Sequence, residues 1–130
     1  MTEPVKKIPS RGRLFKLFTD LGPYFRKQCS TESIFFFDCL EVCVDAEKEP
    51  EEREFYGWWI NLQKDDAAFN YERFDGIYNI QGEWVLEPLS EENKKQTDKS
   101  FKLFIERLEA LIVSETGLEL NAIKEKLVEA

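Results

Sequence analysis

A run of aromatic residues in the middle of the chain, residues 52–62, constrains the fold more than any other stretch. It holds two of the three tryptophans and is flanked by charged segments. Aromatic and β-branched residues suit a pleated, half-buried surface, so the run predicts a central β-strand. Strand alternation would place Tyr56, Trp58, Ile60 and Leu62 on one face and Phe55, Gly57, Trp59 and Asn61 on the other.

Both faces of this strand therefore carry large rings, which a sheet with one solvated face should not show. The second face must be covered by a helix, a loop or another protein. Two interpretations stay open at this point. Either most of the rings belong to the core of the domain, or a few of them form a recognition surface.

The size and charge of the chain narrow the class of protein. A chain of 130 residues with 42% hydrophobic and 14% aromatic content is expected to form one folded domain, with residues 1–9 as a loose arm. The net charge of −8 argues against direct binding to DNA, which requires a basic face. No apolar run reaches the roughly 20 residues of a membrane span, and residues 1–9 lack a secretion signal, so we expect a cytoplasmic protein.

Residues 34–44 predict a second strand, in which Asp38 interrupts an otherwise apolar stripe. Burying a carboxylate alone is costly, so we expect Asp38 to pair with an arginine or a backbone amide rather than to act in catalysis. Cys39 and Cys43 lie too far apart along a strand for a disulfide and are expected to be buried free thiols. An acidic loop, residues 45–52, follows this strand.

Two further strands are predicted after the central one. Residues 69–74 alternate like a strand, Asp75-Gly76 indicates a bulge or a turn, and residues 77–80 continue or restart the strand. Gln81-Gly82 predicts a hairpin tip leading into residues 83–87. Four strands with short connections indicate an antiparallel meander.

The helices lie at the two ends of the chain. Ser10 is the expected N-cap of a helix that Gly22 and Pro23 end, and Ser90 begins a long segment that Gly117 closes. Its apolar stripe consists of Phe101, Phe104, Ile105, Leu108, Leu111 and Ile112. Residues 118–130 predict a short last helix, with residues 121–130 alternatively a weakly ordered tail. The fold class is α+β: a four-stranded antiparallel sheet with an N-terminal helix and a long C-terminal amphipathic helix.

Chemistry-bearing motifs are scarce. The sequence has no histidine, which removes Ser-His and Cys-His nucleophile pairs and makes a zinc site improbable, and it has no glycine-rich phosphate loop. We therefore expect neither an enzyme nor a cofactor.

A basic cluster lies on the first helix and consists of Arg11, Arg13 and Lys16. It is either a solvated face or a docking surface. Aromatic residues and arginine carry much of the energy at protein interfaces, so the composition favours a binding module.

Several motifs together resemble the Crl family of bacterial sigma-factor-binding proteins, over about residues 11–120. They are Arg13-Leu14 with Phe18, Leu21-Gly22-Pro23-Tyr24, Phe35-Phe36-Phe37-Asp38-Cys39-Leu40 with Val42-Cys43-Val44, Arg53-Glu54-Phe55 with Gly57-Trp58-Trp59, Trp84, and the amphipathic C-terminal helix. Tyr56 stands where the family is expected to have tryptophan.

The resemblance implies a transcription activator that binds the stationary-phase sigma factor, sigma S (RpoS), through its domain 2. Such a protein promotes assembly of sigma S with core RNA polymerase, touches the β′ subunit and does not read DNA. The implied sigma-contacting residues are Tyr24, Arg53, Phe55 and Trp58, and the possible supporting residues are Asp38, Cys39 and Arg13. We expect a monomer. The alternative function is a small-ligand-binding domain with an aromatic pocket between the sheet and the loops.

Two of the implied contacts pose structural questions. Phe55 and Trp58 fall on opposite faces of a regular strand, so we expect a twist or bulge near Gly57, or an indirect role for one ring. Arg53 stands among Glu49, Glu51, Glu52 and Glu54. It is expected either to form an intramolecular ion pair on a mobile loop or to bind a carboxylate of the partner with both arms of its guanidinium group.

Overall fold

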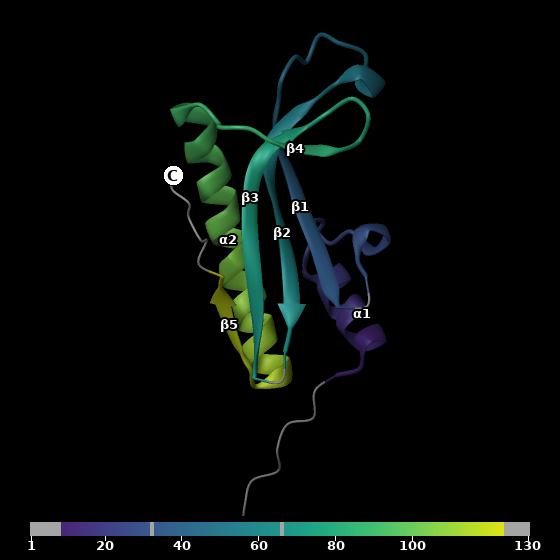
Figure 1. The fold of residues 1–130 in the computed structure, drawn as a ribbon, viewed down its shortest axis with the longest axis vertical. Helices are drawn as coiled ribbons and strands as arrows, with labels where there is room; N and C mark the ends of the chain where they lie inside the picture. Colours follow the sequence, from purple (N-terminus) through teal and green to yellow (C-terminus); the bar gives the residue numbers. More distant parts are fainter. Residues whose placement is uncertain (1–8, 32, 66, 124–130) are drawn as a thin grey trace, which may run out of the picture.

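The computed structural model describes residues 9–31, 33–65 and 67–123. In chain order, the α-helices and β-strands are α1 (Arg11–Leu21), β1 (Ile34–Cys43), β2 (Phe55–Lys64), β3 (Ala68–Tyr78), β4 (Trp84–Leu86), α2 (Glu91–Thr116) and β5 (Glu119–Ala122). Two short 3-10 helices, η1 (Lys27–Cys29) and η2 (Pro50–Glu52), lie in the connections before β1 and before β2. Strands β1 to β4 form an antiparallel meander in sequence order, and β5 adds to β3 in parallel (Figure 1). The predicted α+β class and meander are confirmed.

Strand β2 lies in the middle of the sheet, as the aromatic run predicts. It pairs with β3 in an unbroken register from Phe55–Tyr78 to Lys64–Phe69. Its pairing with β1 is interrupted by a register shift between Leu40 and Val42. The side chains of Trp58, Ile60 and Leu62 are fully buried.

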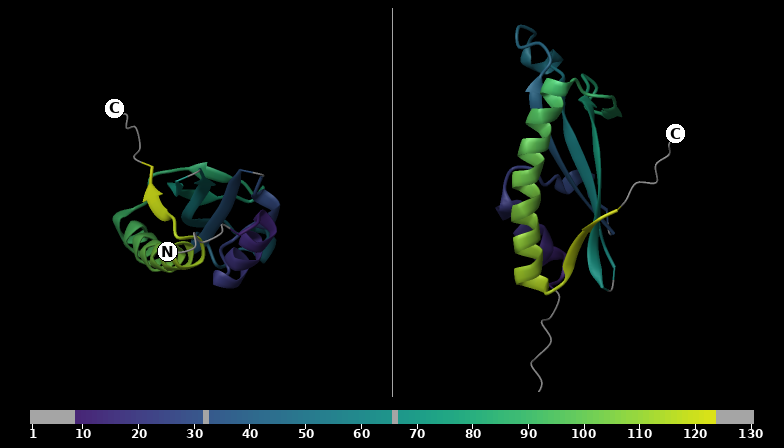
Figure 2. Two further views of the ribbon diagram at one scale, coloured as in Figure 1. Left: turned by 90° about the horizontal axis from the view of Figure 1, so that it is seen from below. Right: turned by 90° about the vertical axis from the view of Figure 1, so that its left-hand side faces the viewer.

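Helices α1 and α2 lie over the same face of the sheet, which we call the covered face (Figure 2). The core forms there from alternate residues of the strands and the inner sides of both helices. Its buried hydrophobic members are Leu14, Phe18, Phe35, Phe37, Cys39, Trp58, Ile60, Leu62, Phe69, Phe101, Phe104, Leu108 and Ile112. Four residues of the predicted apolar stripe on α2 are thus fully part of the core, and Ile105 and Leu111 pack against it.

The opposite face of the sheet, here the open face, carries a second group of rings. Trp59 stacks between Phe74 and Trp84, at centroid distances of 5.3 and 4.8 Å, and Trp84 also contacts Tyr78. These side chains are half-buried. Rings on the open face therefore bury their surface mainly against one another.

The expected last helix is wrong for residues 119–122, which form β5. Gly117 adopts a left-handed conformation at the C-cap of α2 (φ 73°), and the chain then reverses alongside the sheet. Leu120 pairs with Phe69, and both Leu118 and Leu120 pack against the core. The spacing of these two leucines is that of a strand rather than a helix. The rest of the expected helix, residues 124–130, and the expected arm, residues 1–8, lie outside the described residues.

The predicted ends of the other elements are mostly confirmed. Ser10 and Ser90 cap their helices through their side-chain oxygens, which accept from the backbone N–H three residues later. Gly82 forms the hairpin tip with a positive φ of 77°. The expected interruption at Asp75-Gly76 is absent, since β3 runs continuously through both residues.

Gly57 and Gly76 face each other across β2 and β3, and each allows a neighbouring strand to come close. A Cβ atom on Gly57 would lie 1.9 Å from the backbone oxygen of Cys39, and one on Gly76 would lie 2.0 Å from that of Val85. Neither distance is sterically possible. These two positions therefore require glycine in the sheet as it stands.

Candidate protein-binding surface

Trp58 does not lie at the surface, which corrects the expectation that it meets a partner directly. Its side chain has 0% exposure and packs against Phe101 and Phe104 of α2, at centroid distances of 5.1 Å. The indole Nε1 donates a hydrogen bond to Ser100 Oγ at 3.0 Å, so the polar atom is also satisfied. Trp58 can shape a binding surface from beneath but cannot touch a partner without leaving the core.

Tyr24 follows α1 and lies half-buried on top of Trp58. Its ring meets those of Trp58 and Phe104 edge-on, at 5.5 Å each. The backbone holds this position, because Tyr24 O accepts from Asp38 N at 2.9 Å and the next residue bridges to β1. Burial and the neighbouring Cys39 raise the pKa of the Tyr24 hydroxyl. Its proton is therefore retained at neutral pH and can be donated.

A groove opens between Tyr24 and one side of α2. It has a volume of about 530 Å³ and is lined by Tyr24, Ser100, Leu103, Phe104, Glu106, Arg107 and Ala110. We call this the α2 groove. Leu103 lies at the edge of the groove and is 58% exposed, whereas the apolar residues on the inner side of the same helix are buried.

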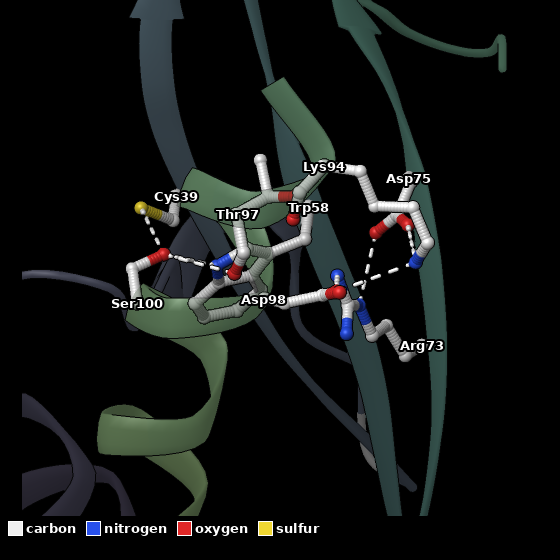
Figure 3. A network of polar contacts seen from close by, with 8 residues as sticks. All are labelled: Cys39, Trp58, Arg73, Asp75, Lys94, Thr97, Asp98 and Ser100. Atoms are coloured by element: carbon white, nitrogen blue, oxygen red, sulfur yellow. Dashed lines mark hydrogen bonds and ion pairs between the residues drawn. The ribbon is translucent and has the colours of Figure 1, made fainter. Parts of the chain in front are cut away.

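Cys39 is buried on the inner side of this groove. Its thiol contacts Glu41 Oε1 at 3.4 Å. It also lies 3.9 Å from Ser100 Oγ, which in turn accepts from Trp58 (Figure 3). Glu41 lies at the register shift of β1. Burial, followed by the charge and hydrogen bond of Glu41, raises the pKa of Cys39 to about 12. The thiol is therefore protonated and unreactive at neutral pH, which fits a structural role.

Asp38 lies on the open face and is paired, as predicted. It accepts from Arg26 Nε at 2.5 Å and from the Trp84 indole at 2.9 Å. Its two oxygens thus hold together the segment after α1, strand β1 and strand β4. A cavity of about 480 Å³ lies here, lined by Arg26, Gln28, Cys29, Phe36, Asp38, Leu40, Tyr78, Gly82 and Trp84. It matches the aromatic pocket of the alternative function.

Arg53 precedes β2 and does not form the ion pair that its acidic neighbours suggest. In the described part of the chain, no carboxylate lies within ion-pair distance of its guanidinium group. Instead, Nε donates to Lys48 O and Nη2 donates to Ala46 O, both at 2.9 Å. Arg53 therefore holds the acidic loop in its folded shape by satisfying two backbone carbonyls.

Phe55 is half-buried at the start of β2, opposite Tyr78 of β3. The expected irregularity near Gly57 exists, but it lies in the neighbouring strand β1, between Leu40 and Val42. Strand β2 itself remains regular. Phe55 and Trp58 thus stay on opposite faces, and Phe55 is not sealed in the core.

The basic cluster on α1 is largely engaged within the molecule. Arg11 donates to Thr31 O at 2.5 Å and lies over the ring of Phe15, and Lys16 pairs with Asp20 at 3.3 Å. Arg13 is exposed, and within the described residues its side chain makes no hydrogen bond or ion pair. Within the part of the chain that the structure describes, Arg13 is therefore the member of this cluster whose guanidinium group has no partner.

A separate ionic network joins α2 to β3 (Figure 3). Arg73 pairs with Asp75 at 2.9 Å and with Asp98 at 2.8 Å, while Lys94 pairs with Asp98 at 3.4 Å. The guanidinium group of Arg73 also lies 4.5 Å from the centre of the Phe101 ring. Although partial burial opposes it, the hydrogen bond and charge of Arg73 and the charge of Lys94 lower the pKa of Asp98.

The structure brings two implied contacts, Tyr24 and Trp58, together on the covered face, whereas Arg53 and Phe55 lie at the start of β2. Sequence reasoning missed the groove residues Ser100, Leu103 and Arg107. One signal was available: Leu103 is a large apolar residue out of phase with the stripe on α2. No signal in the sequence indicated that Glu41 lies at a β-bulge.

This fold and these surfaces define a small α+β binding domain. The described residues contain no group of three or more metal-ligating side chains, and none of their helices is long and apolar enough to cross a membrane. The described surface has two grooves whose linings combine aromatic and aliphatic side chains with charged and polar ones.

Comparison with known proteins identifies the class more closely. The model of the family "Sigma factor-binding transcriptional regulator Crl" matches residues 1–129. A "Sigma factor-binding protein Crl" of Photobacterium profundum is 41% identical over 118 residues, which cover 91% of this chain and 89% of that protein. Proteins of the same description from Vibrio vulnificus and Vibrio cholerae are 38% and 33% identical, with 76% and 78% of this chain and 81% and 79% of theirs covered. The chain belongs to the Crl family of sigma factor-binding transcriptional regulators.

Proposed function

We propose that this protein binds the stationary-phase sigma factor sigma S through its domain 2 and promotes the assembly of sigma S with core RNA polymerase. The observation that carries the proposal is the family match over residues 1–129. The structure adds a suitable surface, since a half-buried tyrosine and an exposed leucine flank one open groove. The protein works in the cytoplasm as a monomer, without a cofactor.

The contact surface in this proposal contains Tyr24, Arg53 and Phe55. Trp58 contributes indirectly, because its buried ring supports that of Tyr24. Asp38 and Cys39 hold β1 against its neighbours and do not meet the partner. Arg53 already uses Nε and Nη2 for loop carbonyls, so a carboxylate of sigma S would engage the guanidinium group from its remaining Nη1 side.

Binding energy alone is sufficient for this activity. A factor that binds the sigma–core complex more tightly than free sigma shifts assembly by the difference in affinity, and about 1.4 kcal/mol is a tenfold shift. The net charge of −8 favours a mechanism through protein contacts rather than through DNA. A further contact with the β′ subunit would tether sigma S to core. The exposed Arg13 is a supporting residue of the sigma-binding surface in this proposal.

The second candidate function is binding of a small ligand in the cavity around Arg26 and Trp84. The volume of about 480 Å³ and the aromatic wall favour it. Against it, both oxygens of Asp38 already accept hydrogen bonds from the protein, which leaves few polar groups to orient a ligand.

Co-purification tests the first function against the second. Tagged protein should retain purified sigma S domain 2 and should increase the fraction of sigma S found with core polymerase at limiting sigma concentration. A panel of metabolites should leave its melting temperature unchanged. Failure to retain sigma S domain 2, together with stabilisation by a metabolite, would reverse the order of the two candidates.

A further inference from the structure

We propose that the α2 groove takes part in partner recognition, and that it receives an amphipathic helix bearing an aliphatic side chain and, one turn away, a carboxylate. This inference rests on the proposed binding of sigma S and extends its surface from Tyr24 along α2. It assigns Leu103 and Arg107 to the recognition of that helix.

The shape of the groove fits a helix. Ser100, Leu103, Arg107 and Ala110 line it at spacings of three, four and three residues along one side of α2. At a rise of 1.5 Å per residue, these positions span about 15 Å, which is nearly three helical turns. Tyr24 and Phe104 complete the wall. An elongated groove with an apolar edge is a common seat for an amphipathic helix.

Leu103 supplies the apolar contact. Its side chain is 58% exposed, whereas Phe101, Phe104 and Leu108 of the same helix are buried in the core. The fold therefore gains little from a leucine at this position. Docking of an aliphatic side chain between Leu103 and the ring of Tyr24 would remove both from water.

Arg107 supplies the charge. It is exposed, and within the described residues it forms no hydrogen bond or ion pair, although it lies close enough to Tyr24 to act on the pKa of that hydroxyl. A carboxylate reaching Arg107 could also accept from the Tyr24 hydroxyl. Glu106 lines the same groove, so a second carboxylate at the neighbouring position would be repelled. The groove thus selects one acidic position rather than a generally acidic helix.

The chain offers matched controls on the same helix. Val113 is 50% exposed but does not line the groove, and Lys102 is an exposed cation that does not line it. Leu103→Asp is therefore compared with Val113→Asp, and Arg107→Glu is compared with Lys102→Glu. Leu103→Met and Arg107→Lys keep the apolar and cationic character of the two positions.

The experiment measures the affinity of each variant for purified sigma S domain 2 by isothermal titration calorimetry, with thermal unfolding to check the fold. We expect Leu103→Asp and Arg107→Glu each to weaken binding by about tenfold or more, as at other interface anchors. Both controls and both conservative variants should bind within roughly threefold of the unsubstituted protein. Melting temperatures should differ little throughout, because all four positions are exposed.

Three results would overturn the inference. If Leu103→Asp and Arg107→Glu bind as tightly as the unsubstituted protein while Tyr24→Ala binds weakly, the groove is not part of the interface, although sigma binding stands. If the Val113→Asp and Lys102→Glu controls weaken binding as much as the groove variants, the effect is not specific to the groove. If the unsubstituted protein does not bind sigma S domain 2, the proposed function fails and the inference falls with it.

Discussion

The two faces of the sheet use aromatic residues in different ways. On the covered face, Trp58 is sealed under α2 and contributes to the core, whereas on the open face its neighbour Trp59 stacks between two half-buried rings. The indole N–H groups on the two faces also have different kinds of partner. The buried indole of Trp58 bonds to a helix, and that of Trp84 bonds to Asp38 within the sheet. The comparison shows that adjacent tryptophans in one strand can have separate roles, one in stability and one at a surface.

The largest expected effect distinguishes the two tryptophans. Trp58→Ala should lower the free energy of unfolding by about 3–5 kcal/mol, because it leaves a cavity under α2. Trp59→Ala should cost about 1–2 kcal/mol, since that ring is partly exposed and loses stacking contacts. Chemical denaturation of both variants measures the difference. Equal losses would mean that the two faces contribute alike, contrary to the comparison.

Gly57 offers a test of how tightly the sheet itself is built. Gly57→Ala should destabilise the fold by about 1–3 kcal/mol, because its Cβ would collide with the backbone of Cys39 and force β1 and β2 apart. The control is Gly12→Ala in α1, where a Cβ meets nothing within 4 Å. That change should be stabilising by up to about 1 kcal/mol, as expected for alanine in a helix. A Gly57→Ala variant as stable as its parent would show that the strands can separate freely.

The smallest expected effect concerns pH and the ionic network that joins α2 to the covered face. The lowered pKa of Asp98 means that its contribution is present above about pH 4, the ordinary aspartate pKa, and is lost as pH falls through the lowered folded value. Because the Asp98 side chain is 48% exposed, the contribution should stay below about 1 kcal/mol. Urea unfolding between about pH 2 and 6 should show a shallower dependence in Asp98→Asn than in its parent. Identical curves would show that the network does not stabilise the fold.

Sequence patterns predicted the strands and helices well but not the face that the helices cover. Strand β1 carries phenylalanines at both odd and even positions, and the buried set is Phe35, Phe37 and Cys39, opposite to the even stripe that contains Asp38. When both faces of a strand are aromatic, alternation alone cannot identify the core. The parallel pairing of β5 was missed for a related reason, since it depends on contacts between residues about 50 positions apart.

In the candidate site, too, the sequence could not identify contacts between residues that are far apart in the chain. The pairing of Asp38 was predictable because an isolated buried carboxylate is costly in any fold. Its partners were not, since Arg26 and Trp84 lie 12 and 46 residues away. For Arg53, the acidic neighbours in sequence suggested an ion pair, but the loop geometry presents backbone carbonyls instead. The acidic residues next to Arg53 in the sequence therefore suggested the wrong partner group for its guanidinium.

The most direct test of the account is a calorimetric titration of sigma S domain 2 with the unsubstituted protein and with Arg53→Lys. We predict saturable one-to-one binding for the unsubstituted protein and a roughly tenfold weaker affinity for Arg53→Lys, since lysine keeps the charge but cannot hold two loop carbonyls and a carboxylate together. Equal affinities would remove Arg53 from the surface. Absence of binding by the unsubstituted protein at about 100 μM would contradict the central claim that this domain acts by binding sigma S.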